Sequence, residues 1–278
     1  MIAYFTKTSI GYSHIKENKC CQDYSACYHD EERTIITACD GHGGDLYVRS
    51  HLGSKFASEA VIKVLKELER GDFYKYSRKD IRNNLRLKIL CEWNAMVERD
   101  LSRKYITKRE VAHLNEDRFF RVKQNPEKAY GTTLNAAMIL GTKLICVSIG
   151  DGGCFLVKSG QCISPFPEDD DEPVANITYS LCQDDAFSHL QVSVHELSAY
   201  DGAVVCTDGM INPYQNLSNF STGLIAPAIM NLYLGKFEQL SAFVSEVGTK
   251  LGTGDDVSLG ILVKGKVSIR AYSKAKGI

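Results

Sequence analysis

The spacing of apolar residues predicts strands near the N-terminus, followed by two amphipathic helices. Residues 3–13 and 22–40 contain short apolar runs with turn residues between them, a pattern typical of strands. Residues 45–68 and 80–101 instead carry apolar residues at helical spacing, so each region should bury one face. The first stripe comprises Leu46, Phe56, Ala60, Val61, Val64 and Leu65, and the second Ile81, Leu85, Ile89, Trp93 and Val97.

The second half of the chain alternates between strand patterns and a further pair of helices. Residues 102–128 are charged and weakly periodic, which indicates a helix end and a loop. The acidic, proline-bracketed segment 165–173 is predicted to be a solvated surface loop, with a functional lid as the alternative. The remaining expected elements are three or four strands from Gly131 to Ser164, further strands up to Asp208, helices at 221–234 and 236–251, a strand at 257–263, and a short strand with frayed chain at 264–278.

Two clusters of strands, each interrupted by a helix pair, predict an α+β fold built in layers. No internal repeat or long linker divides the sequence, so we expect residues 1–278 to form one domain. A net charge of −1 gives no general attraction to nucleic acid or to an anionic membrane. No apolar run reaches the roughly 20 residues that a membrane helix needs. We therefore expect no nucleic-acid partner and no membrane insertion.

The ten cysteines invite a disulfide framework or a zinc site, but their spacing argues against both. There is no Cys-x-x-Cys pair, and Cys20 and Cys21 are adjacent, which is poor geometry for a bridge between them. Cys39, Cys146 and Cys206 lie inside apolar runs, as buried small hydrophobic residues do. We expect reduced thiols and a cytoplasmic location.

The most informative residues are aspartates at the ends of separate apolar runs. Asp40, Asp151 and Asp208 each follow such a run, and Asp255 stands in Gly254-Asp255-Asp256, immediately before the last one. Asp23 stands near the N-terminus in a similar position. Carboxylates at strand ends can converge, and hard oxygen ligands without Cys or His partners suit magnesium or manganese rather than zinc.

These aspartates resemble the motifs of a known family in composition and order. The blocks are Asp40-Gly41-His42-Gly43-Gly44, Gly131-Thr132-Thr133, Gly150-Asp151-Gly152, Thr207-Asp208-Gly209 and Gly254-Asp255-Asp256. In this order they resemble the metal-dependent serine/threonine phosphatases of the protein phosphatase 2C family, over roughly residues 5 to 263. Ser13-His14 followed by Cys21-Gln22-Asp23 looks like a bacterial branch of that family.

The resemblance implies a four-layer α/β/β/α sandwich of two antiparallel sheets flanked by helix pairs. It also implies a binuclear manganese or magnesium centre with a possible third ion, and a bridging hydroxide that hydrolyses phosphoserine and phosphothreonine. By this resemblance Asp40 bridges both ions, Gly41 offers its carbonyl, Asp208 and Asp255 bind one ion, Asp23 reaches the ions largely through water, and Asp151 matches the position of the third ion. The partners would be a phosphoprotein substrate and an opposing serine/threonine kinase.

His42 is the candidate general acid that protonates the departing serine or threonine oxygen. A structural histidine that hydrogen-bonds a turn is the alternative. We expect Gly43 and Gly44 to allow a tight turn that opens the helix at Asp45. Thr132 should begin a buried strand without a chemical role.

The chain departs from the family pattern where the phosphate should bind. Gln22 replaces a common acidic residue, although its side chain could hydrogen-bond a metal-bound water. Asn18 stands where relatives commonly carry a phosphate-binding arginine, and Gly152-Gly153 replaces a common Ser-Arg. Lys16 and Lys19 flank Asn18 and could supply positive charge, although lysine lacks the bidentate fork of arginine.

Two other functions therefore stay open. A scaffold could keep the ions and recognise partners without turnover, as the missing arginine suggests. A hydrolase with the same chemistry could instead take a small phosphoester or a nucleotide, but no phosphate-cradling Gly-x-x-x-x-Gly-Lys loop occurs.

Overall fold

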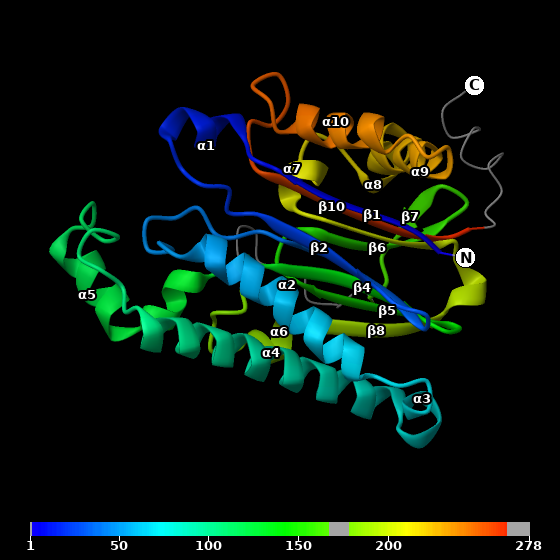
Figure 1. The fold of residues 1–278 in the computed structure, drawn as a ribbon, viewed down its shortest axis with the longest axis horizontal. Helices are drawn as coiled ribbons and strands as arrows, with labels where there is room; N and C mark the ends of the chain where they lie inside the picture. Colours follow the sequence, from blue (N-terminus) through cyan, green and yellow to red (C-terminus); the bar gives the residue numbers. More distant parts are fainter. Residues whose placement is uncertain (1, 167–177, 266–278) are drawn as a thin grey trace.

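The computed structural model describes residues 2–166 and 178–265, and its centre is a pair of five-stranded antiparallel sheets (Figure 1). One sheet has the strand order β1-β10-β9-β6-β7 and the other β2-β3-β4-β5-β8. The strands are β1 (Ile2–Ser9), β2 (Tyr24–His29), β3 (Arg33–Cys39), β4 (Leu134–Leu140), β5 (Lys143–Ile149), β6 (Gly153–Lys158), β7 (Gln161–Ile163), β8 (Gln191–Glu196), β9 (Gly202–Cys206) and β10 (Val257–Lys264).

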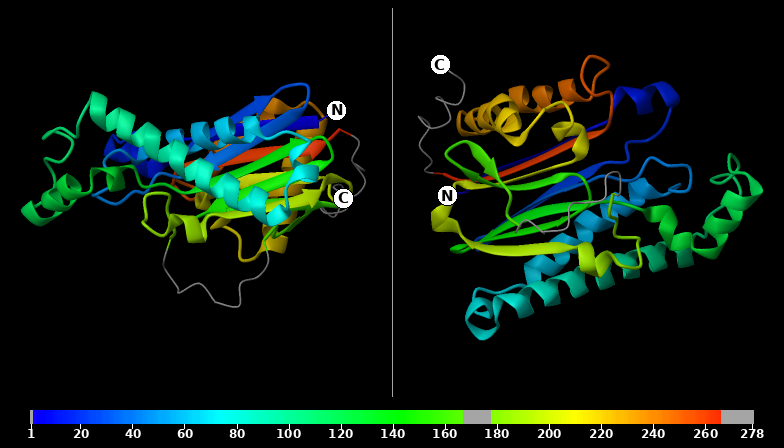
Figure 2. Two further views of the ribbon diagram at one scale, coloured as in Figure 1. Left: turned by 90° about the horizontal axis from the view of Figure 1, so that it is seen from below. Right: turned by 180° about the vertical axis from the view of Figure 1, so that it is seen from behind.

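Helices cover the outer face of each sheet, which confirms the predicted α+β sandwich (Figures 1 and 2). The pair α2 and α4 packs on the second sheet, and α9 and α10 pack on the first. The α-helices are α1 (Tyr12–Glu17), α2 (Ser50–Glu67), α3 (Asp72–Lys75), α4 (Arg78–Arg103), α5 (Glu116–Gln124), α6 (Ala186–His189), α7 (Asp208–Ile211), α8 (Leu217–Phe220), α9 (Ala226–Tyr233) and α10 (Phe237–Val247). Short 3-10 or π turns are η1 (Pro126–Tyr130), η2 (Leu197–Ala199) and η3 (Ser221–Ile225).

The central strands are mostly apolar because both of their faces are buried. Ile36 and Ala137 of one sheet and Val205 and Leu262 of the other belong to a single cluster between the sheets. The alternate residues of the same strands, such as Ile35 and Met138, face the α2 and α4 helices. Each Å² of apolar surface removed from water stabilises the folded state by about 25 cal/mol. The apolar contacts between the sheets and under the helices therefore hold the sandwich together.

Local sequence signals fix where several elements begin and turn. Ser77 caps α4, because its side chain accepts a hydrogen bond from the Asp80 amide at 3.1 Å. Ser159 and Gly160, with φ of 51° and 80°, form the two-residue connection between β6 and β7. Positive φ at both central residues gives the twist that a tight hairpin requires. On its other side β6 pairs with β9, the strand that ends two residues before Asp208.

Two predicted boundaries near the N-terminus were wrong. The first strand ends at Ser9 rather than at residue 13, and residues 12–17 form the short helix α1. Distant chain holds α1 in place, since the Tyr12 amide donates to the Gly248 carbonyl and the Ser13 amide to the Gly254 carbonyl. A six-residue helix with no buried residue has no apolar period for the sequence to reveal.

The helix predicted from Asp45 begins five residues later, at Ser50. Backbone hydrogen bonds hold the intervening residues in place. The Tyr47 amide donates to the Gly44 carbonyl in a turn, and the Arg49 amide donates to the distant Ala129 carbonyl. Residues 102–128 contain a further helix, α5, capped by the Asn115 side chain. The predicted acidic loop at 165–173 and the tail at 264–278 fall largely outside the described residues.

All ten cysteines lie in the described part of the chain, and all of them are free thiols. Six of them, including Cys39, Cys146 and Cys206, are buried as predicted. Among the described helices, none combines the length and the apolar character needed to cross a membrane.

Candidate metal centre

Three of the predicted aspartates converge at one end of the sandwich. Asp40 follows β3, Asp151 lies two residues after β5, and Asp208 is the first residue of α7 after β9. One carboxylate oxygen from each of them lies within 4.8 Å of those of the other two. The two sheets thus contribute to one site, with β3 and β5 from one sheet and β9 from the other.

The backbone around Asp40 is fixed by the two threonines that precede β4. The Asp40 amide donates to the Thr133 hydroxyl at 3.0 Å, and the Asp40 carbonyl accepts from the Thr133 amide at 2.8 Å. The Thr132 hydroxyl also donates to the Asp40 carbonyl at 2.8 Å. The sequence predicted no chemical role for Thr132, but its side chain helps to hold Asp40, the central residue of the site.

Clustered negative charge makes the site unfavourable without cations. Burial raises the pKa of Asp40, and the nearby charges of Asp23 and Asp208 raise it further. Burial also raises the pKa of Asp208, followed by the charges of Asp151 and Asp255. Among the described residues, no Lys or Arg forms an ion pair with these carboxylates. A set of oxygen donors with uncompensated charge fits hard divalent cations.

Asp23 and Asp255 lie at the periphery of this cluster, one buried and one exposed. Asp23 is 6% exposed and accepts a hydrogen bond from the Thr207 hydroxyl at 2.8 Å. Burial raises the pKa of Asp23 to about 8, although the Thr207 hydrogen bond opposes the change. Asp255 is exposed, and its charge is among the causes that raise the pKa of Asp208. Asp23 therefore lies behind Asp40, and Asp255 stands on the solvent side.

His42 and Gly41 continue the chain from Asp40 into the site. The Gly41 amide donates to the Gln22 carbonyl at 3.1 Å, and a Cβ at Gly41 would lie 2.6 Å from the Ser50 carbonyl oxygen. The His42 amide donates to the Gly131 carbonyl, and the His42 ring meets the Tyr47 ring edge-on at 4.8 Å between centroids. Burial lowers the pKa of His42, while the Asp151 charge opposes the change.

Gln22 joins the two sides of the site through its backbone and its side chain. The Gln22 carbonyl accepts from the Gly41 amide and from the Ser54 hydroxyl. Its side-chain amide donates to the His42 carbonyl at 3.3 Å and to the Ser50 hydroxyl at 2.8 Å. The side-chain NH₂ group of Gln22, which could have hydrogen-bonded a metal-bound water, thus binds protein groups instead.

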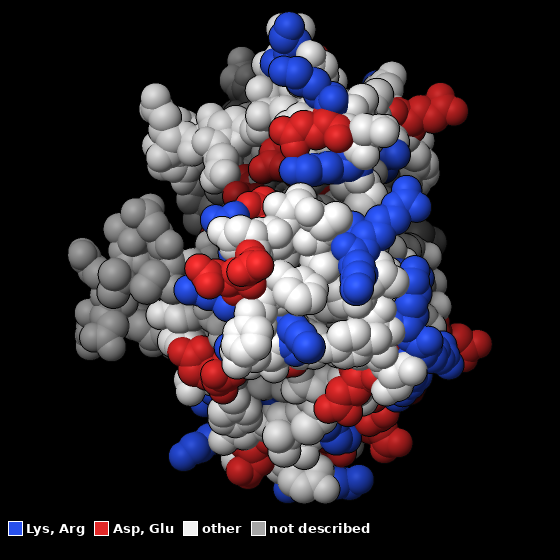
Figure 3. Space-filling model, turned by 90° about the vertical axis from the view of Figure 1, so that its left-hand side faces the viewer, with Lys and Arg blue, Asp and Glu red and all other residues white. Residues whose placement is uncertain are grey.

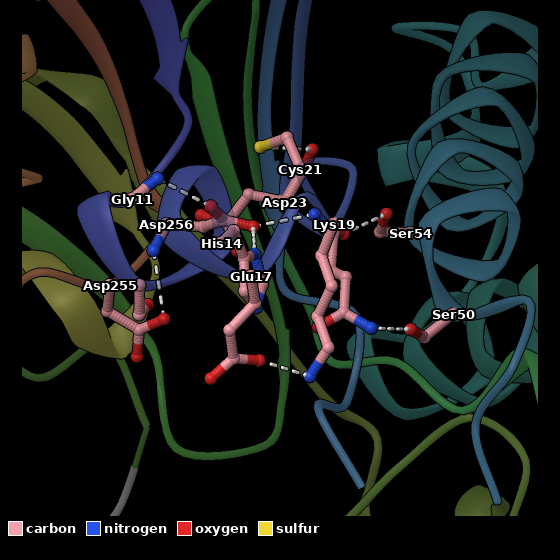
Figure 4. Close-up of polar contacts among 12 residues, drawn as sticks. Gly11, His14, Glu17, Lys19, Cys21, Asp23, Ser50, Ser54, Asp255 and Asp256 are labelled. Atoms are coloured by element: carbon pink, nitrogen blue, oxygen red, sulfur yellow. Dashed lines mark hydrogen bonds and ion pairs between the residues drawn. The ribbon is translucent and has the colours of Figure 1, made fainter. Parts of the chain in front are cut away.

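Asp256 holds the N-terminal segment against the turn that carries Asp255 (Figure 4). It is only 4% exposed, and its carboxylate accepts from the Gly11 amide at 2.7 Å and from the Gln22 amide at 2.6 Å. The His14 ring nitrogen Nδ1 lies 2.8 Å from the same carboxylate. Gly11 packs so closely that a Cβ there would lie 2.2 Å from the Asp255 carbonyl carbon. In the sequence, the pair Asp255-Asp256 was the one signal that a second carboxylate here could hold the N-terminal segment.

The three residues proposed for phosphate binding lie on or just after α1 and are all exposed. Asn18 caps the C-terminus of α1 with φ of 57°, a left-handed conformation that asparagine tolerates. Lys19 forms an ion pair with Glu17 at 2.7 Å (Figure 4). Lys16 has no ion pair among the described residues, so it is the better candidate of the two lysines.

A buried arginine stabilises the chain that leads into the site. Arg49 side-chain atoms are 3% exposed and bind Glu110 at 2.7 Å, Asp100 at 3.0 Å and the Tyr130 hydroxyl at 2.6 Å. The Tyr130 hydroxyl also donates to Asp100 at 2.5 Å. Since Tyr130 directly precedes Gly131, the cluster joins α2, α4 and the 107–110 turn to the strand entry that holds Asp40.

We expect Glu110→Gln to reduce the free energy of unfolding by about 2 kcal/mol at pH 7. The hydrogen bond from Arg49 lowers the pKa of Glu110 to about 2, against a reference of 4.5. Because the folded-state pKa is depressed, this stability is present above about pH 4.5 and disappears as the pH falls toward 2. Denaturant unfolding at several pH values measures the difference. The exposed Glu98→Gln is the matched control, and equal losses in both variants at pH 7 would contradict the expectation.

Comparison with solved structures shows that the fold is shared with serine/threonine phosphatases. A bacterial serine phosphatase aligns with a TM-score of 0.59 and 15% identity, covering 96% of this chain and 100% of that one. The phosphatase Stp1 from Staphylococcus aureus aligns with a TM-score of 0.54 and 13% identity, covering 95% of each chain. The catalytic domain of the phosphatase PstP, solved with two manganese ions, aligns with a TM-score of 0.53 and 17% identity, covering 94% and 97%.

No curated protein matches the sequence itself. The family model of protein phosphatase 2C does match it, over residues 10–238. That match includes Asp23, Asp40, Asp151 and Asp208 and ends before Asp255. With the clustered carboxylates and the shared sandwich, it shows that this chain belongs to the protein phosphatase 2C family and is a metal-dependent serine/threonine protein phosphatase.

Proposed function

We propose that the chain hydrolyses phosphoserine and phosphothreonine in proteins at a centre of two manganese or magnesium ions. The observation that carries this proposal is the convergence of Asp40, Asp151 and Asp208 without a basic partner. Asp40 would be a ligand of both ions, the Gly41 carbonyl would add a further ligand, and Asp208 and Asp255 would hold one ion. Asp151 is reserved for a third, weaker ion. Asp23 orients water from behind Asp40.

The protein's own contribution is to hold mutually repelling carboxylates in place. At an effective dielectric constant of 20, two such charges about 4 Å apart repel by about 4 kcal/mol, and burial adds to that cost. The hydrogen bonds of Thr132 and Thr133 fix the Asp40 backbone, and the Thr207 hydroxyl holds the Asp23 carboxylate. When bound, two divalent cations offset the repulsion and lower the pKa of a coordinated water, which supplies a nucleophile at neutral pH.

His42 is proposed to give a proton to the departing serine or threonine oxygen. The position of His42 supports this role, because it follows Asp40 by two residues. Its amide is held by the Gly131 carbonyl, and its ring packs against Tyr47. Burial lowers the pKa of His42 and so disfavours its protonated form, and water would return the proton that the ring gives up.

Phosphate binding is proposed to involve Lys16 in place of the arginine that relatives carry at the position of Asn18. We expect Lys16→Ala to raise the KM for a phosphothreonine peptide about threefold to tenfold, because one charge-assisted contact to phosphate is lost. Lys19→Ala is the matched comparison, since Lys19 already pairs with Glu17. Steady-state kinetics of the two variants decide the matter, and an unchanged KM in Lys16→Ala would remove the proposal.

Hydrolysis of a phosphothreonine peptide and of p-nitrophenyl phosphate, with manganese, with magnesium and with chelator, tests the proposed reaction. Phosphate release that needs a metal and a phosphopeptide supports it. Binding of manganese without any release would favour the alternative of a scaffold that recognises partners, for which Asn18 is the motivating observation. Release from small esters alone would favour a small-molecule substrate.

We propose a single catalytic domain over residues 1–278, supported by the cluster of apolar residues shared between both sheets. We also propose a cytoplasmic location and an opposing serine/threonine kinase that supplies the phosphoprotein. The ten free cysteines support a reducing compartment.

A further inference from the structure

A basic arm extends beyond the sheets at the end of the molecule that holds the metal centre. The arm comprises residues 104–124, between the end of α4 and the end of α5, and it projects past α1 and the start of α2 (Figures 1 and 2). It contains six Lys or Arg and three Asp or Glu, a net charge of +3, in a chain whose net charge is −1. Glu110 of the arm is bound by Arg49, whereas the basic residues of α5, Arg118, Arg121 and Lys123, form no ion pair with the catalytic carboxylates.

The arm is attached to residues 42–47, the loop that carries His42. Arg118 forms an ion pair with Asp45, and the His113 ring nitrogen Nε2 lies 3.3 Å from the Asp45 carbonyl oxygen. Asp45 is three residues from His42 along the same loop, and Tyr47 of this loop packs against the His42 ring. A ligand that touches the arm is therefore adjacent to the loop that carries the proposed general acid.

A shallow hollow of about 240 Å³ lies between the arm and this loop. Its lining comprises Gly44, Asp45, Leu46 and Tyr47 from the loop and Arg118 and Arg121 from α5. Arg118 is partly neutralised by Asp45, whereas Arg121 is exposed and has no ion pair among the described residues. A hollow of this size suits one side chain of a larger ligand rather than a whole drug-sized molecule.

The exposed surface of α5 adds apolar contact beside this positive charge. Phe119 and Phe120 are 40% and 57% exposed, and Lys123 follows them on the same helix. Large exposed aromatic residues beside an arginine are typical of protein contact sites. Figure 3, which looks onto this end of the molecule, shows Lys and Arg side chains beside uncharged surface with acidic groups between them. A ligand would therefore be recognised here by contacts with individual side chains and not by long-range electrostatic attraction.

We propose that the basic arm binds acidic residues that flank the phosphorylated residue of the protein substrate, with Arg121 as the principal contact. The guanidinium group matches the planar carboxylate or phosphate group in a bidentate manner, which suits aspartate, glutamate or a second phosphorylated residue. The arm would thereby select phosphoproteins with acidic sequence around the target site. This inference rests on the proposed function, since it assumes a phosphoprotein substrate.

Three phosphothreonine peptides with acidic, neutral or basic flanks test the arm. We expect wild type to prefer the acidic over the neutral peptide by about fivefold in kcat/KM, mainly through KM, which is the scale of an exposed ion pair. Arg121→Glu should abolish that preference and shift it toward the basic peptide. Lys79→Glu, an equivalent charge reversal at the far end of α4, should keep the wild-type preference. The preference should also shrink at high salt.

Binding of the same peptides, labelled with a fluorophore, gives a result even without turnover. Tighter binding of the acidic peptide that is lost in Arg121→Glu supports the arm, whether or not phosphate is released. Equal affinity for the acidic and neutral peptides in wild type, or a preference that survives Arg121→Glu, overturns it. Absence of hydrolysis with every peptide and ester would count against the proposed reaction alone, so the two failures are distinguishable.

Discussion

Asp40→Asn is expected to reduce metal-dependent phosphate release by at least about 10³-fold, the scale of losing an electrostatic group at a reacting centre. Asp40 is central to the carboxylate cluster, and burial and three neighbouring charges raise its pKa. The neutral amide should therefore weaken cation binding. The same substitution removes a repelling charge, so in chelator the variant should unfold at the same temperature as wild type or at a higher one. Phosphate release and thermal unfolding measure the two effects.

Asp184→Asn is the control for this variant, because that aspartate side chain is 93% exposed and lies outside the carboxylate cluster. Its activity should match that of wild type. Equal rates in Asp40→Asn and wild type would sink the proposed centre. A rate loss accompanied by a large fall in unfolding temperature in chelator would instead mean that Asp40 acts chiefly in folding.

Asp256→Ala is expected to destabilise the protein by about 2–4 kcal/mol even in chelator, because two buried backbone donors lose their acceptor. Those donors are the amides of Gly11 and Gln22, and the His14 ring loses its partner too. For a chain of this size the unfolding temperature should fall by roughly 5–12 °C. Activity should fall as well, since the loss frees the segment that Gln22 ties to Gly41.

The neighbouring residue Asp255 supplies a sharp comparison. Asp255→Ala should impair manganese binding and phosphate release, yet it should leave stability in chelator near that of wild type, because the side chain is exposed. Thermal unfolding in chelator and a manganese titration therefore separate the two adjacent aspartates. Equal losses of stability in chelator for Asp256→Ala and Asp255→Ala would show that the proposed roles are wrong. Those roles are structural support for Asp256 and metal binding for Asp255.

The sequence allowed the fold to be predicted wherever burial leaves a periodic signal. The stripe from Ile81 to Val97 predicted α4 within a few residues of its true limits, and the apolar runs before Asp40 and Asp208 predicted β3 and β9. Helix α1 gave no such signal because none of its residues is buried. Its position depends on bonds to Gly248 and Gly254, more than 230 residues away in the chain.

The same distinction holds within the site. Aspartates at strand ends could be recognised individually, and three of them converge. The supporting residues could not be recognised, because Thr132, Gln22 and Asp256 act through hydrogen bonds whose partners are set by tertiary packing. Helix α5 was missed for a related reason, since its single buried residue, Val122, leaves almost no period in a charged segment.

The position of β1 has a consequence for the order in which the molecule can fold. β1 is an edge strand whose one neighbour in its sheet is β10, about 255 residues later in the chain. Until β10 has been synthesised, β1 has no strand to pair with, and its backbone groups form an open edge. Closing so long a loop is entropically costly, which makes this pairing a late and slow step. Asp255 lies two residues before β10, so the catalytic centre should be among the last parts of the molecule to form, and a nascent chain should be inactive until β10 docks.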